Sequence, residues 1–238
     1  MCYYSPRCGI IICSLLFFFC LQRLNALNML ITGKELGFGL RGEYNRTFAS
    51  CGDFSLLGAI ELNDKYTFKG GFAIGNLDDD TEIKAFTSGH IALFSVIPLY
   101  VNLAYNYYGL PEQRYNFHAN AALPSVSLNG RWAGITIGVN FRFSSFLDEP
   151  SIFEPALAFL GYVNFFNNER LRVALSCANF SDFYMGNMGA YFFKLNADIH
   201  ITNQWSLLSA IELLQSGGDG LTTAFYGIAY SGGLKFVW

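Results

Sequence analysis

Hydrophobic residues alternate with small or polar residues along most of this chain, which is the spacing of a β-strand and not that of a helix. The clearest case spans residues 133–143, where one face consists of Ala133, Ile135, Ile137, Val139, Phe141 and Phe143. The other face of that segment carries Gly134, Thr136, Gly138, Asn140 and Arg142. The same pattern recurs in residues 36–47, 66–75, 99–107, 171–179 and 191–200. The pattern therefore predicts an all-β fold.

Two kinds of connection separate the predicted strands. Tight hairpin turns, mostly rich in Asn, Asp and Gly, occupy residues 63–65, 95–98, 129–130, 167–169 and 202–204. Polar loops occupy residues 48–53, 77–81, 109–114, 144–151, 181–188 and 216–223. Five turns and six loops make eleven connections, which predicts an up-and-down antiparallel barrel of about twelve strands, each of roughly 9 to 11 residues.

The sixth predicted strand is the least regular. His118 and Asn120 begin it in one phase, but Pro124 is expected to shift that phase before Val126 and Leu128. A proline within a closed sheet implies either a bulge or a missing hydrogen bond. If this strand does not form, ten or eight strands are the next even counts.

The amino-terminal segment is predicted to be a cleaved signal peptide. Residues 9–21 form an uncharged, mostly apolar run of 13 residues, too short for a membrane-spanning helix but long enough for a secretory core. Ala26 offers a small residue at the cut, which leaves a barrel of residues 27–238. A lipoprotein anchored through Cys20 is disfavoured because a bulky phenylalanine precedes it. An uncleaved anchor is the third alternative.

Composition narrows the class of fold. Charged residues make up 14 % of the chain, against about 25 % in ordinary soluble domains. Hydrophobic residues reach 52 % and aromatic residues 17 %. Yet beyond residue 27 no apolar run approaches the roughly 18 residues of a transmembrane helix. The formal net charge of −3 gives no sign of a nucleic-acid partner.

The aromatic residues favour a barrel that faces lipid over a secreted soluble barrel, which would turn its apolar face inward. Nearly every strand has one face rich in Leu, Ile, Val and Phe, more than one modest cavity could hold. Towards the strand ends on that face, where aromatic girdles belong, lie Tyr66, Tyr105, Tyr107, Phe143, Phe153, Phe165, Tyr191, Trp205 and Trp238.

The end of the chain carries the resemblance to a known family. Counting back from Trp238, the residues on its side are Phe236, Leu234, Tyr230, Ile228 and Tyr226. A strand that alternates up to a final aromatic residue resembles the closing strand of bacterial outer-membrane β-barrels, among them small porin-like, OmpW-like and Tsx-like proteins. The resemblance implies an integral outer-membrane protein in contact with lipid, with its tight turns in the periplasm. It also implies that the barrel-assembly machinery reads a signal formed by Tyr230, Leu234, Phe236 and Trp238.

The polar faces predict a barrel interior with nearly balanced charge. Its basic residues would be Arg41, Lys69, Lys84, Arg142, Arg172, Lys194 and Lys235. Its acidic residues would be Glu43, Glu61, Glu154, Asp198 and Glu212. Two interpretations remain open: a salt-bridged network that plugs the barrel, or a hydrated pore.

The pore interpretation predicts a narrow channel for passive diffusion of small hydrophilic solutes or ions. The residues expected to line it are Arg41, Glu43, Lys69, Lys84, Arg142, Arg172, Lys194 and Glu212. Because all outward loops are short, we expect a monomer without an inward-folding loop. The alternative is a surface adhesin or structural barrel whose loops bind a partner, and a lipid-modifying enzyme is a remote third.

Little in the sequence points to catalysis. His90, His118 and His200 are all predicted to face the interior, and no Gly-x-Ser-x-Gly motif occurs, so we expect no enzyme activity. The acidic residues 78–80, followed by Glu82, are interpreted as a solvated loop tip. After signal cleavage, Cys51 and Cys177 remain, without the paired spacing of a metal site, and are interpreted as free thiols. No cofactor or metal is predicted.

Overall fold

The structure is a computed structural model. It describes residues 31–45, 51–62, 65–77, 80–94, 97–111, 116–146, 152–182, 190–217 and 223–238, at some strand ends through the backbone alone. The predicted signal peptide, residues 1–26, lies outside the described residues. No helix in the described part of the chain is long and apolar enough to cross a membrane.

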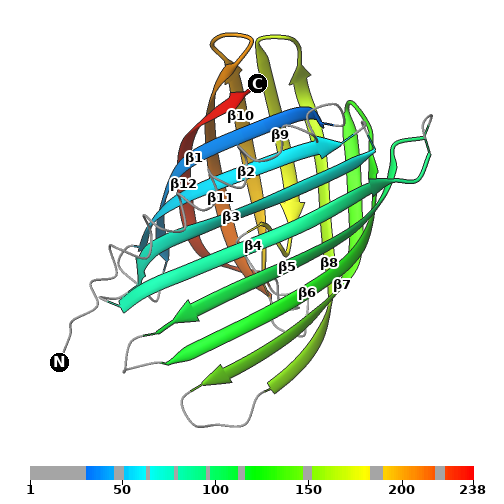
Figure 1. The fold of residues 1–238 in the computed structure, drawn as a ribbon. Coiled ribbons are helices and arrows are strands. Elements are labelled where there is room, and N and C mark those ends of the chain that lie inside the picture. Colours follow the sequence, from blue (N-terminus) through cyan, green and yellow to red (C-terminus); the bar gives the residue numbers. More distant parts are fainter. Residues whose placement is uncertain are drawn as a thin grey trace, which may run out of the picture.

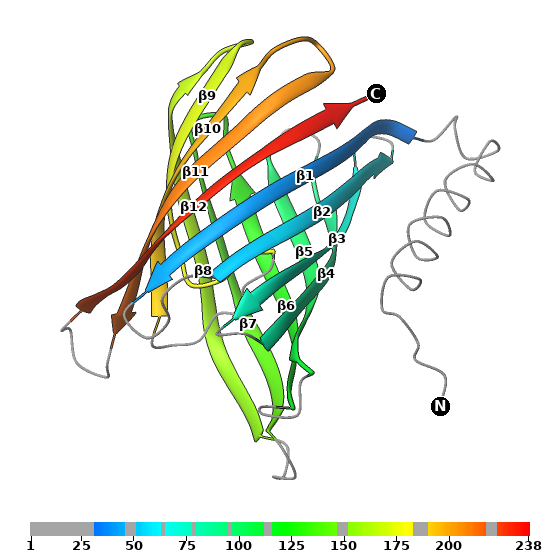
Figure 2. The ribbon, with the colours of Figure 1, turned by 90° about the vertical axis from the view of Figure 1, so that its left-hand side faces the viewer.

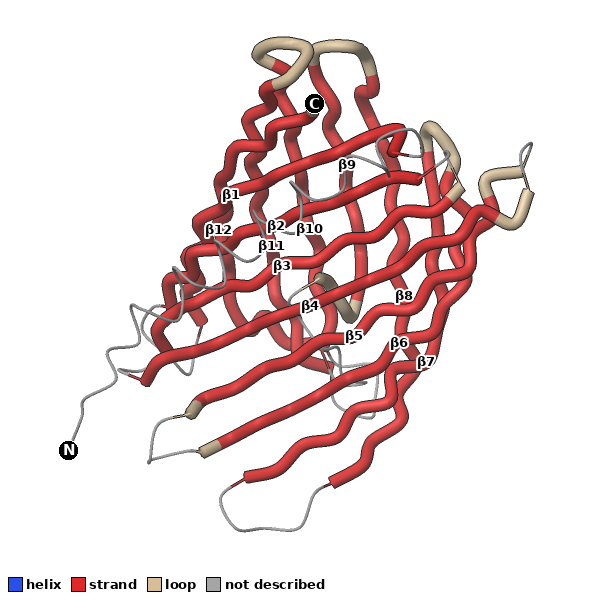
Figure 3. The backbone as a smooth tube through the Cα atoms, in the orientation of Figure 1, coloured by secondary structure: helices blue, strands red, loops and turns tan. Residues whose placement is uncertain are grey.

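The described chain forms one closed antiparallel barrel, in which each strand pairs with its neighbours in sequence (Figure 1, Figure 3). Its strands are β1 (Ile31–Asn45), β2 (Cys51–Leu62), β3 (Tyr66–Leu77), β4 (Asp80–Ala92), β5 (Leu99–Leu110), β6 (Phe117–Asn129), β7 (Ala133–Phe146), β8 (Ile152–Asn167), β9 (Leu171–Ala178), β10 (Ala190–His200), β11 (Trp205–Gly217) and β12 (Thr223–Val237). The predicted count of twelve strands is therefore confirmed. The strands are mostly longer than predicted, because several loops were assigned residues that continue the ladder.

The barrel closes where β12 returns to β1, and the two strands run side by side in Figure 2. Residues Glu35 to Asn45 of β1 pair with Val237 to Gly227 of β12 in unbroken register. Closure pairs the edge groups of the first and last strands, which lipid could not satisfy.

Side chains alternate between a polar interior and an apolar exterior. On β5, Leu103 is 60 % exposed whereas its neighbour Asn102 is 5 % exposed. Buried interior positions on several strands carry alanine, serine or asparagine. Seven of the nine aromatic residues predicted for the girdles have the register of the outer face, and the other two, Phe165 in the β8 bulge and Trp238 after β12, are exposed. The predicted arrangement, in which the apolar face of each strand points outward to lipid, is therefore confirmed.

Strand β6 corrects two of the sequence predictions. Pro124 does not shift the phase, since Ala122 pairs with Phe141 and Ser125 pairs with Gly138 in the same register. The ladder with β7 simply lapses at residues 123 and 124, because proline has no N–H to donate. With one phase kept throughout, His118 shares the outer face with Pro124, so the prediction that it faces the interior is wrong.

Glycine permits a close approach of the backbones at the closing seam. Gly233 of β12 lies against β1, where an added Cβ would clash with the carbonyl oxygen of Phe38 and lie 3.2 Å from Gly39 Cα. At the adjacent Gly232, the nearest atom to such a Cβ is the Leu208 carbonyl oxygen, 3.9 Å away.

We therefore expect Gly233→Ala to lower the free energy of unfolding by about 1–3 kcal/mol, the usual cost of overpacking. Gly232→Ala should leave it unchanged or raise it by about 0.5–1 kcal/mol, because alanine restricts the unfolded chain. Urea titration in detergent micelles, followed by tryptophan fluorescence, measures both variants. Equal losses would contradict the seam geometry.

Candidate functional site

Most of the predicted charged residues line one continuous interior surface. Facing inward from β3 to β12 are Lys69, Lys84, Arg142, Glu154, Arg172, Lys194, Asp198, Glu212 and Lys235. Arg41 and Glu43 belong to β1 and Glu61 to β2, but their side chains lie outside the described part of the structure. Sequence alternation thus assigned the faces of these strands correctly.

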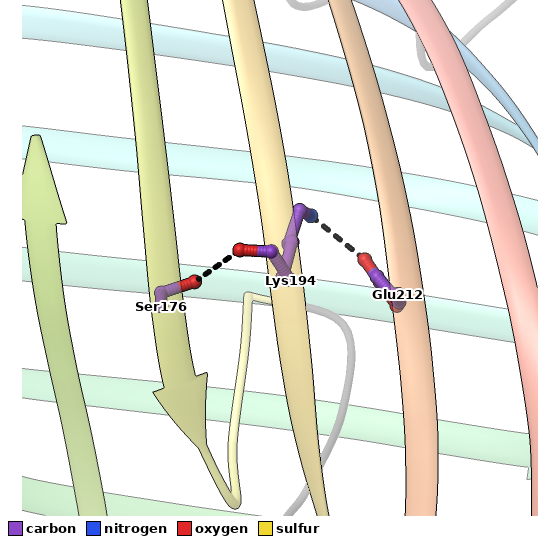
Figure 4. Close-up of polar contacts among 3 residues, drawn as sticks. All are labelled: Ser176, Lys194 and Glu212. Carbon is purple, nitrogen blue, oxygen red and sulfur yellow. Dashed lines mark hydrogen bonds and ion pairs between the residues drawn. The ribbon is translucent and has the colours of Figure 1, made fainter. Parts of the chain in front are cut away.

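Four of the interior charges form two close, largely buried ion pairs. Lys194 Nζ lies 2.8 Å from Glu212 Oε1, and the Ser176 hydroxyl donates to the Lys194 carbonyl oxygen at 3.4 Å (Figure 4). Lys84 Nζ lies 2.6 Å from Glu82 Oε2. Glu82 was predicted to belong to a solvated loop, but β4 already begins at Asp80 and places Glu82 inside, 5 % exposed. Pairing is what makes such buried charges tolerable.

Other interior charges are held more loosely. Arg142 lies 3.9 Å from Glu154, and Lys235 lies 3.9 Å from Glu35. Arg172 donates from Nε to Asn164 Oδ1 at 3.1 Å and makes no ion pair with any described residue. Looser pairing leaves these groups available to water or solute.

A polar network crosses four neighbouring strands of the interior wall. His90 Nδ1 on β4 lies 2.7 Å from Asn102 Oδ1 on β5. Asn102 Nδ2 donates to Ser127 Oγ on β6 at 2.6 Å, and Ser127 lies 2.8 Å from Thr136 Oγ1 on β7. Prediction of this network requires the register between the strands, which the sequence alone does not give.

The chain leaves the wall after β9 and enters the barrel, as the short tan segment inside the ring shows (Figure 3). Asn106 Nδ2 on β5 donates to the carbonyl oxygens of Ser181 and Asp182, at 3.2 and 2.8 Å. Residues 180–182 therefore reach from β9 towards β5. The prediction that no loop folds inward is wrong, because β9 stops after 8 residues.

Asn179 makes this early exit possible. Its Oδ1 accepts from the backbone N–H of Phe159 at 2.8 Å, and its Nδ2 donates to the Leu157 carbonyl oxygen at 2.7 Å. The side chain thereby takes the ladder positions on β8 that a longer β9 would have used. A cavity of about 30 Å³ remains between segment 180–182 and the wall.

The remaining predicted residues lie outside the interior or outside the described residues. Tyr230, Leu234, Phe236 and Trp238 share the outer face of β12, where the Phe236 ring lies 4.8 Å from Trp205 and 5.3 Å from Trp238. Cys177 is free and takes the outward register of β9, whereas the Cys51 side chain is not described. Residues 78 and 79 of the acidic loop also lie outside the described part. Among described residues, no group of His, Cys, Asp or Glu could hold a metal ion.

Comparison with known proteins identifies the fold. No family model and no curated protein matches the sequence. The NanC porin structure matches with a TM-score of 0.54 at 12 % identity, over 84 % of this chain and 98 % of that one. The translocator domain of the autotransporter NalP from Neisseria meningitidis matches with a TM-score of 0.53 at 12 % identity, over 86 % and 88 %. An outer-membrane channel from Pseudomonas putida F1 matches with a TM-score of 0.52 at 9 % identity, over 88 % and 96 %.

At such identities the likeness concerns the fold. The chain has the fold of a twelve-stranded outer-membrane β-barrel and resembles small porins in that fold. Its tight turns and its last residue share one side, the periplasmic side in such barrels.

The docking of residues 180–182 depends on Asn106. Asn106→Ala removes two hydrogen bonds of about 1 kcal/mol each, which shifts the docking equilibrium of residues 180–182 by roughly thirtyfold. In a chain with Ser181→Cys and all native cysteines replaced by serine, a water-soluble thiol reagent should then modify residue 181 correspondingly faster. Asn196→Ala, which alters an interior asparagine of β10, is the matched control. Equal rates in both variants would contradict the docking.

Proposed function

We propose that the barrel is a narrow channel for passive diffusion of small hydrophilic solutes or ions. The observation that carries the proposal is a closed interior wall lined by charged and polar side chains and narrowed by residues 180–182. Side chains can fill the interior of an eight-stranded barrel. A barrel of twelve strands is wider, which leaves more space inside. The inward segment supplies the constriction that would limit the size of the solute.

Exposure of the interior charges favours a pore over a plug. Lys69 and Arg172 remain exposed although both face the inside of the ring, and so does Asp182 of the inward segment. A charge enclosed by a dry protein interior would need a close partner. These three groups make no ion pair with a described residue, so their exposure is best explained by water inside the barrel.

The distribution of charge supports weak ion selectivity. Lys84 and Lys194 are neutralised by adjacent carboxylates, and their fields are largely local. The net field along the interior would then be dominated by the loosely held groups, chiefly Lys69, Arg142 and Arg172 on the basic side. Carboxylates are held as loosely, at Glu35, Glu154, Asp182 and Asp198. We therefore infer only weak selectivity between ions and a path for neutral polar solutes.

The named structural neighbours support the proposal without deciding it. NanC is a porin and the Pseudomonas putida protein a channel, whereas NalP contributes a translocator domain. The same fold thus serves different functions, and the function of each barrel depends on the residues in its interior. The alternative for this chain, a mount for surface loops that bind a partner, depends on loops that lie largely outside the described residues.

Single-channel recording of the purified protein in a planar bilayer tests the proposal. We expect discrete conductance steps and, under a salt gradient, a reversal potential that Arg172→Glu moves towards cation preference. Arg131→Glu is the matched control, because Arg131 lies in the turn between β6 and β7, with its guanidinium 5.3 Å from the Trp132 ring. A folded barrel without conductance steps would refute the channel. Equal shifts in both variants would show that the interior charge does not set selectivity.

A further inference from the structure

Three interior side chains stand in the order of a nucleophile, a base and a group that orients the base. Ser88 Oγ lies 3.3 Å from His90 Nε2, and His90 Nδ1 lies 2.7 Å from Asn102 Oδ1. Ser88 and His90 are two residues apart on β4, so both side chains share one face, and Asn102 pairs with His90 across β5. Many serine nucleophiles are activated by such a chain of contacts.

The hydrogen bonds around Asn102 determine where the imidazole proton lies. Asn102 Nδ2 donates to Ser125 Oγ at 3.2 Å and to Ser127 Oγ at 2.6 Å, so its Oδ1 is left as the acceptor that faces the ring. His90 must therefore donate from Nδ1. In the neutral imidazole, Nε2 is then the unprotonated nitrogen, which can accept the proton of the Ser88 hydroxyl.

The positive charge of a lysine lies on the same wall. Lys69 of β3 pairs directly with Ser88 across the ladder, and both residues have the interior register. Directly opposite side chains of an antiparallel pair have Cβ atoms about 5 Å apart. The Lys69 side chain thus starts beside Ser88, and its ammonium group is the nearest interior cation in register that could stabilise the negative charge developing on a carbonyl oxygen under attack.

A second serine–histidine pair in the barrel lacks the third group. His200 Nδ1 lies 2.7 Å from Ser206 Oγ, and the structure describes no further hydrogen bond of that ring. His200 therefore contacts its serine through Nδ1, the ring nitrogen that in His90 contacts Asn102. Ser206, 2 % exposed, provides a matched internal control for Ser88, which is 6 % exposed.

We propose that Ser88, His90 and Asn102 form a hydrolytic site for small carboxylic esters that enter the barrel. The Ser88 oxygen bonds to the ester carbonyl carbon while His90 Nε2 takes its proton, and the departing alcohol leaves with that proton. Water then adds to the acyl-serine, giving a proton to His90, and the free acid departs as the proton returns to Ser88. Asn102 is a positioning residue, since it acts through His90.

The burial of Ser88 limits the substrates. At 6 % exposure its hydroxyl admits a slender acyl group such as acetyl and not a long chain. The site needs water in the interior, as the proposed channel does, but it does not need solute to cross the membrane. Esterase activity and conductance can therefore fail independently.

Labelling of the full chain with diisopropyl fluorophosphate, followed by peptide mass spectrometry, tests the site. We expect modification at Ser88 and not at Ser206. Hydrolysis of p-nitrophenyl acetate should fall at least about a hundredfold in Ser88→Ala, which removes the nucleophile while sparing the fold. Ser206→Ala should leave the rate unchanged. A heat-dependent shift in electrophoretic mobility equal to that of the parent would confirm that the Ser88→Ala barrel is folded.

Variants at Asn102 separate orientation from a merely structural role. Asn102→Leu should abolish labelling of Ser88, whereas Asn102→Asp keeps an acceptor for His90 Nδ1 and should retain it. Absent labelling of Ser88 in the folded parent, or equal labelling of Ser88 and Ser206, would overturn the proposal. An acetate hydrolysis rate that Ser88→Ala leaves unchanged would do the same.

Discussion

Pairing of the backbone N–H and C=O groups between strands, around a closed ring, organises this molecule. A strand in hydrocarbon has no water to satisfy its N–H and C=O groups, so a spanning sheet has to close on itself. The chain meets this requirement by pairing β1 with β12 along Glu35 to Asn45, and Gly233 allows the two backbones to approach there. Closure in turn fixes which side of every strand meets lipid and which side meets the interior.

The same constraint explains which contacts the interior side chains make. Once the ring is closed, each polar position of the alternation must find a partner or water inside it. Lys194 and Glu212 satisfy one another across β10 and β11, and Asn102 links three strands through its amide. Where β9 ends early, the Asn179 amide satisfies backbone groups of β8, which frees the following residues to cross the lumen. The proposed constriction and the proposed ester site both result from the way in which these interior polar groups are paired.

Features that depend on strand periodicity could be predicted from the sequence. The alternation of β7 and the turns rich in Asn, Asp and Gly sufficed to predict twelve strands and the side of residues such as Lys84 and Arg172. Features that depend on register between strands could not be predicted. Asn102 lies beside His90 only because β4 and β5 pair at those positions, and no pattern within either strand indicates it.

Two errors show where local patterns mislead. Pro124 was expected to change the phase of β6, but the sheet tolerates one missing hydrogen bond more readily than a register shift, so His118 stays outside. There it lies 2.8 Å from the Tyr107 hydroxyl, a polar contact on a face that is otherwise largely apolar. The inward course of residues 180–182 was missed because Asn179 resembles an ordinary strand end in sequence.

A cysteine scan along β5 distinguishes a hydrated interior, lined by one face of each strand, from a dry one. With all native cysteines replaced by serine, single cysteines from position 101 to position 106 would be exposed to a membrane-impermeant thiol reagent. The structure predicts reaction at 104, slower reaction at 102 and 106, which are 5 % and 7 % exposed, and protection at 101, 103 and 105. Protection of both sets would contradict a hydrated interior, and reaction of the odd positions alone would contradict the assignment of the faces.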